Sequence, residues 1–212
     1  MNEQPLNYQD VVPDYESYLH FQKSKYSSFE SRVFNWEAGQ GLYLEKIFKH
    51  IDRKAVIADI SCGDGVGLRW FRNTGFENVT GIELNKEKIA LAVLSGYRVL
   101  EGDFHNLCML KDEEFDVVYS SHSLEHAYWP DKVIKEFYRI LKPNGQLFVV
   151  LPYPDLEKNN VEAHGAKFEL GTTILDNGES VIRFFSDRKF EFQSKQLDSF
   201  REPEIWLEFK KE

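Results

Sequence analysis

A carboxylate and three glycines follow a short apolar segment in the first third of the chain. Residues 55–60 are apolar or β-branched apart from Asp59, a composition typical of a strand covered on both faces. Gly63, Gly65 and Gly67 then occupy alternate positions. Glycine permits a positive φ and a close ligand, and a helix after such a turn directs its amide dipoles at it. The stretch predicts a nucleotide-type binding loop at the carboxyl end of a first parallel strand.

Two further carboxylates follow the next two predicted strands, 78–83 and 97–100. Glu83 ends the first of them, at the position where a carboxylate accepts hydrogen bonds from a ribose diol in dinucleotide-binding folds. Asp103 and Phe104 follow the second strand. The glycines are spaced G-x-G-x-G instead of G-x-G-x-x-G, and this spacing argues against a nicotinamide-dependent oxidoreductase.

A cluster of serine, histidine and glutamate residues follows the predicted strand 115–121. The carboxyl ends of parallel strands meet at one edge of a sheet, so we expect Ser121 and His126 at the ligand crevice. His122 and His126 are four residues apart, a spacing that can bind a metal on a helix. The chain has no G-x-S-x-G sequence, which argues against a Ser-His-Asp hydrolase.

The landmarks between residues 55 and 152 strongly resemble, in their order, the small-molecule branch of the class I S-adenosylmethionine-dependent methyltransferases. They are the glycine loop with its preceding Asp59, Gly81-Ile-Glu83, Glu101-Gly-Asp103-Phe104, the Leu-Glu-His126 element and Lys142-Pro-Asn-Gly145. The resemblance implies S-adenosyl-L-methionine as cofactor and S-adenosyl-L-homocysteine as product. The cofactor contacts that it implies are Asp59, Gly63, Gly65, Glu83, Leu84, Asp103, Phe104 and Ser121. It implies no metal, because family members without a metal also carry the histidine at position 126.

Strand and helix patterns alternate along the middle of the chain. The predicted strands are 55–60, 78–83, 97–100, 115–121 and 146–151, and the predicted helices are 36–50 (capped by Asn35), 66–74, 86–94, 130–141 and 178–186. Segments 190–197 and 204–210 predict an antiparallel hairpin. We expect an α/β fold: a Rossmann-like, doubly wound, seven-stranded, mostly parallel sheet with a C-terminal antiparallel hairpin and an N-terminal helical cap. Residues 1–212 then form one domain, with a cap or lid at 1–50, a cofactor-binding core at 55–152, and an acceptor loop and hairpin at 153–212.

Methyl transfer asks a protein mainly to hold the acceptor in line with the methyl group and, for some acceptors, to take up a proton. The candidates for these catalytic roles are His126, Tyr153 and His164. Tyr153 follows the last parallel strand and should face the crevice, and His164 stands in a long stretch of weak periodicity.

The first 36 residues are rich in large aromatic side chains. Such rings bury the open side of the sheet, form a lid that excludes water from the crevice, or cover a dimer interface, and the sequence leaves these interpretations open. The residues most relevant to this question are Tyr15, Tyr18, Tyr26 and Trp36.

Composition narrows the class of partner. The net charge is −9, from 35 acidic and 26 basic residues, and this balance disfavours nucleic acid and anionic membranes. No apolar run approaches the ~18 residues of a membrane span, no secretory signal is present, and Cys62 and Cys108 form no motif. We expect a cytoplasmic methyltransferase, monomeric or homodimeric, that acts on a small molecule. A protein methyltransferase and a non-catalytic scaffold or activator subunit are the alternatives.

Overall fold

Seven strands form one sheet, and the computed structural model describes residues 11–27, 36–199 and 202–212 of the chain. The strand order is β3-β2-β1-β4-β5-β7-β6. The bounds are β1 Val56–Ile60, β2 Asn78–Glu83, β3 Arg98–Glu101, β4 Phe115–Ser121, β5 Leu141–Pro152, β6 Phe190–Asp198 and β7 Glu204–Lys211. The pairs among β1 to β5 are parallel, whereas β7 lies antiparallel between β5 and β6. The predicted α/β class, with its mostly parallel sheet and C-terminal hairpin, is confirmed.

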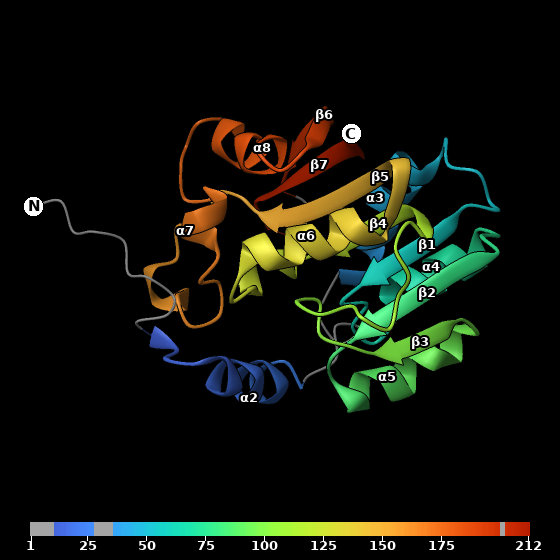
Figure 1. Cartoon of the computed structure of the whole chain (residues 1–212), viewed down its shortest axis with the longest axis horizontal. Helices are drawn as coiled ribbons and strands as arrows, with labels where there is room; N and C mark the ends of the chain where they lie inside the picture. The colour runs from blue at the N-terminus through green and yellow to red at the C-terminus, as the bar shows by residue number, and fades with distance from the viewer. Residues whose placement is uncertain (1–10, 28–35, 200–201) are drawn as a thin grey trace, which may run out of the picture.

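Helices cover both faces of this sheet (Figure 1). The α-helices are α2 Tyr15–Lys25, α3 Trp36–Phe48, α4 Val66–Asn73, α5 Lys86–Ala92, α6 Pro130–Ile140, α7 Lys167–Leu170 and α8 Glu179–Ser186. Short 3-10 turns stand at η2 Val93–Ser95, η3 Leu124–His126 and η4 Lys158–Asn160. None of the helices in the described residues is long and apolar enough to cross a membrane.

Alternate residues of the central strands serve two separate cores. In β4, Val118 packs in the core shared with α6 and α8, whereas Val117 and Tyr119 pack in the core shared with α3 and α4. This division follows from the two-residue period of a strand, which sends successive side chains to opposite faces. Both cores are aromatic-rich: Phe137 lies in the first and Phe48 in the second, each fully buried.

Most elements differ from the prediction by one or two residues at a boundary, and three differences are informative. The fifth strand begins at Leu141, which pairs with Phe115, and the predicted Pro-Gly turn is an irregularity within the strand's pairing. The helix from residue 86 ends at Ala92, because a 3-10 turn and the left-handed Gly96 (φ 84°) follow it. The stretch 153–173 contains η4 and α7 and is therefore more regular than its sequence indicates.

The N-terminal cap contains α2, which lies apart from the helices on the two faces of the sheet (Figure 1). Asp14 caps it by accepting a hydrogen bond of 2.7 Å from the Ser17 amide. Tyr18 is buried against Tyr128, and the ring of Tyr15 stacks on Trp129 with centroids 4.7 Å apart. The predicted cap by Asn35 lies outside the described residues.

Gly65 joins β1 to α4 in a conformation that glycine alone adopts easily. Its φ is 87°, and a Cβ atom there would lie 2.9 Å from Cα of Ala92 in α5. Gly75 ends the same helix with a similar φ of 83°, but no atom lies within 4 Å of the position of its Cβ. Replacing either glycine would therefore strain the backbone, but only at Gly65 would the new side chain also clash with α5.

This comparison predicts the outcome of two alanine substitutions. Gly75→Ala should lower the free energy of unfolding by about 1–2 kcal/mol, the cost of a left-handed non-glycine residue. Gly65→Ala should lower it further, by about 1–3 kcal/mol, because α5 must also move. Urea denaturation of both variants measures the difference, and equal losses would show that α4 and α5 are not packed as described.

Candidate functional site

The site lies where the sheet connections diverge, at the carboxyl ends of β1 and β4. These two parallel strands are neighbours, and β2 and β5 lie on their outer sides. Ser61 and His122 follow β1 and β4 directly, and both adopt positive φ angles of 58° and 49°. Such strained non-glycine backbone is typical of functional sites. Ser61 and His122 also line two cavities in common, so the two cavities form one crevice.

The smaller cavity, about 60 Å³, lies beside the glycine loop and is lined by acceptor groups. Among the described residues, Oε1 of Gln40, Oδ2 of Asp59 and Oγ of Ser121 are buried and have no hydrogen-bond partner. Nε2 of Gln40 donates to the Tyr119 hydroxyl over 3.0 Å, which fixes the amide's orientation. Burial, and next the charge of Glu83, raise the pKa of Asp59 to about 8. A cationic donor fits such a cavity, because it would satisfy these acceptors.

The carboxylate of Glu83 is held by backbone amides of two loops. It accepts hydrogen bonds of 2.9 Å from the amides of Gly63, Leu84 and Asn85. Both Glu83 and Leu84 line the larger cavity, of about 110 Å³. The glycine loop and the carboxylate at the end of the second strand, each expected to contact the cofactor, are thus hydrogen-bonded to each other.

Asp103 and Phe104 line the same cavity from the loop after β3. The carboxylate of Asp103 accepts from the His105 amide (3.0 Å), from the His105 ring (2.8 Å) and from the Tyr15 hydroxyl. Burial alone would raise the pKa of Asp103, but these hydrogen bonds outweigh burial and hold it below its usual value. Asp103 is therefore an ionised acceptor fixed beside a buried aromatic ring.

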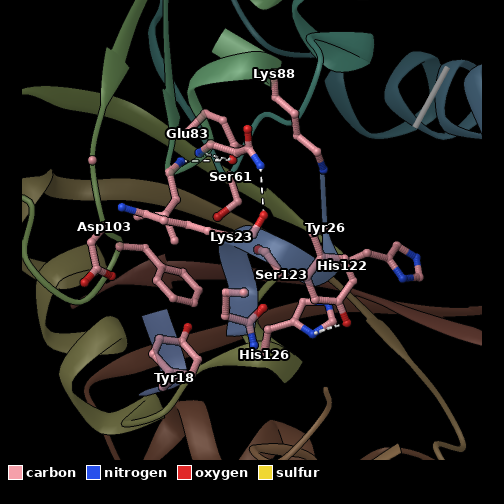
Figure 2. A pocket seen from close by; sticks show the side chains of 15 residues that line it. Tyr18, Lys23, Tyr26, Ser61, Glu83, Lys88, Asp103, His122, Ser123 and His126 are labelled. Atoms are coloured by element: carbon pink, nitrogen blue, oxygen red, sulfur yellow. Dashed lines mark hydrogen bonds between the residues drawn. The ribbon is translucent and has the colours of Figure 1, made fainter. Parts of the chain in front are cut away.

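Helix α2 contributes one wall of the larger cavity (Figure 2). Tyr18, Gln22, Lys23 and Tyr26 line it, and the Asn85 side-chain amide donates to the Lys23 carbonyl over 3.2 Å. This contact joins the N-terminal cap to the loop after β2. Nothing is described for the side chain of Trp36, the remaining aromatic residue expected to matter here.

His126 lines the larger cavity, and His164 packs behind it without lining either cavity. Their ring centroids lie 4.7 Å apart. Burial, and next the neighbouring His164, lower the pKa of His126 to about 3, so its ring is neutral at physiological pH. Glu125 stands beside them, only 1% exposed, and burial raises its pKa well above the usual value.

Tyr153 and Gly65 also line neither cavity, so with His164 three predicted site residues lie outside the lining. The hydroxyl of Tyr153 donates to the Ile174 carbonyl and accepts from the Gly178 amide, each over 2.8 Å. The structure thus places Tyr153 as a support of the loop before α8, away from the two histidines. Gly65 serves the site indirectly, as the N-cap of α4.

Sequence reasoning missed several residues of the crevice. Gln40 comes from α3, far from any motif, and its two flanking glycines gave no functional signal. Lys88 and Asn85 follow Glu83 on α5 and its cap, and both line the larger cavity. The position of Lys88, one helical turn beyond the Asn85 cap, is the only signal that could have indicated it.

Known proteins match both the core and the whole fold. Residues 58–149 match the family described as "Methyltransferase domain". A ubiquinone biosynthesis O-methyltransferase of Pseudomonas putida (strain GB-1) is 34% identical over 109 residues, 46% of this chain and 47% of that protein. The chain thus spans about half the length of this curated relative.

Two solved structures extend the likeness beyond the core. A structure titled as the [4+2]-cyclase SpnF superposes with a TM-score of 0.68 at 16% identity and covers 100% of this chain and 99% of that one. A Thermotoga maritima S-adenosylmethionine-dependent methyltransferase, titled as a possible histamine N-methyltransferase, superposes with a TM-score of 0.65 at 20% identity. It covers 92% of this chain and 100% of that one. Residues 58–149 thus match a methyltransferase domain, and the whole chain has the fold of the solved S-adenosylmethionine-dependent methyltransferase with which it superposes.

Proposed function

We propose that the chain transfers the methyl group of S-adenosylmethionine to a small-molecule acceptor in the crevice between Ser61 and His122. The observation that carries this proposal is the lining of the smaller cavity. Three buried acceptor atoms, from Gln40, Asp59 and Ser121, have no partner among the described residues. The ammonium group of the cofactor's methionine part offers the donors that they lack.

The remaining expected contacts follow the crevice outward. Glu83 would accept from the ribose diol, Asp103 from the adenine amino group, and Phe104 and Leu84 would cover the adenine ring. The amide of Gly63 lies in the same loop, held by Glu83. When bound, S-adenosylmethionine supplies a methyl group activated by a positively charged sulfur atom.

The acceptor would lie at the end of the crevice that His126 lines, with His164 packed behind it. In-line attack needs the acceptor atom fixed on the far side of the methyl group, and two neighbouring imidazoles can orient it or accept its proton. The structure gives Tyr153 a supporting position, so we assign these roles to the two histidines alone. The acidic balance of the chain favours a small molecule over nucleic acid.

Helix α2 is proposed as a lid over this crevice. Four of its residues, or residues directly after it, form the cavity wall, and its contact with Asn85 is a single side-chain hydrogen bond. Opening would break this bond, the hydrogen bond from Tyr15 to Asp103, and the packing of the α2 aromatic rings on the segment before α6.

A second candidate function is suggested by the fold neighbour titled as a [4+2]-cyclase, which covers the whole chain. Its title shows that this architecture serves reactions other than methylation. Incubation with labelled S-adenosylmethionine and a panel of acceptors separates the two: methylated product supports the first function, and unlabelled rearranged product supports the second.

Glu83→Gln is predicted to weaken binding of S-adenosylhomocysteine by roughly 10–100-fold. The reason is the loss of charge-assisted hydrogen bonds, each of about 1.5–3 kcal/mol. The matched control is Glu101→Gln, the same change at the residue that pairs with Glu83 from β3, where the side chain is exposed. Isothermal titration calorimetry measures both variants. Unchanged binding by Glu83→Gln would refute the assignment of the cofactor to this crevice.

Binding of S-adenosylhomocysteine at pH 7 is predicted to release a proton from Asp59. A carboxyl with a pKa of about 8 is about nine-tenths protonated at pH 7, and a bound ammonium favours the carboxylate, so the pKa falls on binding. Calorimetry in buffers of different ionisation enthalpy reports the number of protons released. Asp59→Asn, which cannot ionise, should abolish the release, and an equal release from this variant would contradict the prediction.

A further inference from the structure

Three potential metal ligands converge beside the larger cavity, which one of them, His126, lines. They are the carboxylate of Glu125, the ring of His126 and the ring of His164, and one ligand atom from each lies within 4.8 Å of the others. Glu125 and His126 belong to η3, and His164 belongs to the segment between η4 and α7. The chain thus brings together side chains that are almost forty positions apart.

Hydrogen bonds to the protein fix both histidines in the same tautomer. Nδ1 of His126 lies 2.6 Å from the Ala163 carbonyl, which can only accept, so this nitrogen carries the proton. Nδ1 of His164 lies 2.8 Å from Oδ2 of Asp155, a buried carboxylate that is also paired with the Lys167 ammonium. In both rings Nε2 is left with a lone pair. A histidine whose other nitrogen donates to a carboxylate or a carbonyl is the usual arrangement at protein metal sites.

Glu125 adds an acceptor that the described residues do not satisfy. Its side chain is 1% exposed, and Oε2 has no hydrogen-bond partner among them. Its Oε1 lies 3.8 Å from Nε2 of His126, which carries no proton to donate. Burial of an acceptor without a donor is costly. Two imidazole lone pairs and the unsatisfied carboxyl group of Glu125 therefore meet at one point.

We propose that Glu125, His126 and His164 bind a divalent first-row transition-metal cation. Ligands about 2.0–2.2 Å from one cation lie about 3–3.5 Å apart, so the observed 3.8 Å separation of His126 and Glu125 needs to close by only a few tenths of an ångström. Two imidazoles and one carboxylate suit zinc, iron, cobalt or manganese better than magnesium or calcium, which prefer oxygen ligands.

The position of the site also suggests its use, and this part rests on the proposed methyl transfer. Three protein ligands leave coordination positions for an oxygen atom of the acceptor. A cation there lowers the pKa of a bound hydroxyl group, so the hydroxyl proton passes to solvent. The oxygen then forms a bond to the methyl carbon while the carbon–sulfur bond breaks, and S-adenosylhomocysteine leaves. In this arrangement both imidazoles orient the acceptor through the metal, and neither takes up its proton. We therefore infer a hydroxylated acceptor that reaches the metal through an oxygen atom.

Cobalt(II) titration of untagged, chelator-treated protein tests the site directly. Visible absorption should report one bound ion per chain, and zinc should displace it. His126→Gln and His164→Gln should each weaken cobalt binding at least tenfold, and Asp155→Asn, which frees the His164 ring, by about 10–100-fold. His50→Gln is the matched control, the same change at an exposed histidine on the surface, and should bind cobalt like the wild type.

Circular dichroism and titration with S-adenosylhomocysteine accompany each variant. Where a histidine variant fails to fold, Glu125→Gln replaces it, because this change keeps the shape and removes the charge. The proposal is overturned if the wild type binds no stoichiometric cobalt, or if cobalt binding is unchanged in the ligand variants. Lack of cobalt binding with S-adenosylhomocysteine binding intact overturns this inference alone, whereas the reverse result overturns the proposed function alone.

Discussion

The buried carboxylate of Glu83 is the interaction on which the crevice depends. It accepts one hydrogen bond from Gly63, in the loop after β1, and two from Leu84 and Asn85, in the loop after β2. The side chain of Asn85 in turn caps α5, and its amide group donates a hydrogen bond to the Lys23 carbonyl. One side chain therefore fixes the glycine loop, the start of α5 and the residue that contacts the N-terminal cap. Charge-assisted hydrogen bonds of this kind are among the stronger ones in proteins.

The parts of the fold that could be predicted are those whose signals are local. β1 and β4 are mostly apolar because most of their residues are buried on both faces of the sheet, and α6 shows its apolar positions at helical spacing. The glycine loop and the carboxylates after β2 and β3 sit next to their strands in the sequence. Their meeting at one edge of the sheet therefore follows from parallel strand order alone.

The contacts that could not be predicted join distant segments through tertiary packing. Gln40 reaches the glycine loop from α3, and Tyr15 reaches Asp103 from α2, with no motif at either helix position. Tyr153 was expected in the crevice because it follows β5, but its hydroxyl is hydrogen-bonded to the loop before α8. Position along the chain defines where a backbone goes, whereas a side chain's direction depends on partners that become neighbours only after folding.

The same limit explains why no metal was expected from the sequence. Only His122 and His126 stood at a suggestive spacing, and the structure separates their roles: Nε2 of His122 lies 2.6 Å from Glu204, while His126 faces His164. The second histidine of the proposed metal site is His164, from the segment before α7. Asp155, which is paired with Lys167, orients its ring.

Both ends of the crevice share one electrostatic property, an excess of acceptor atoms over donors. At the glycine loop these acceptors are Gln40, Asp59 and Ser121, and at the other end they are Glu125 and the two histidines. A methyl donor that carries positive charge suits the first end, and a metal cation suits the second. Between the two ends, the carboxylates of Glu202 and Glu204 lie 3.4 and 2.6 Å from the nitrogens of His122, the side chain that lines both cavities.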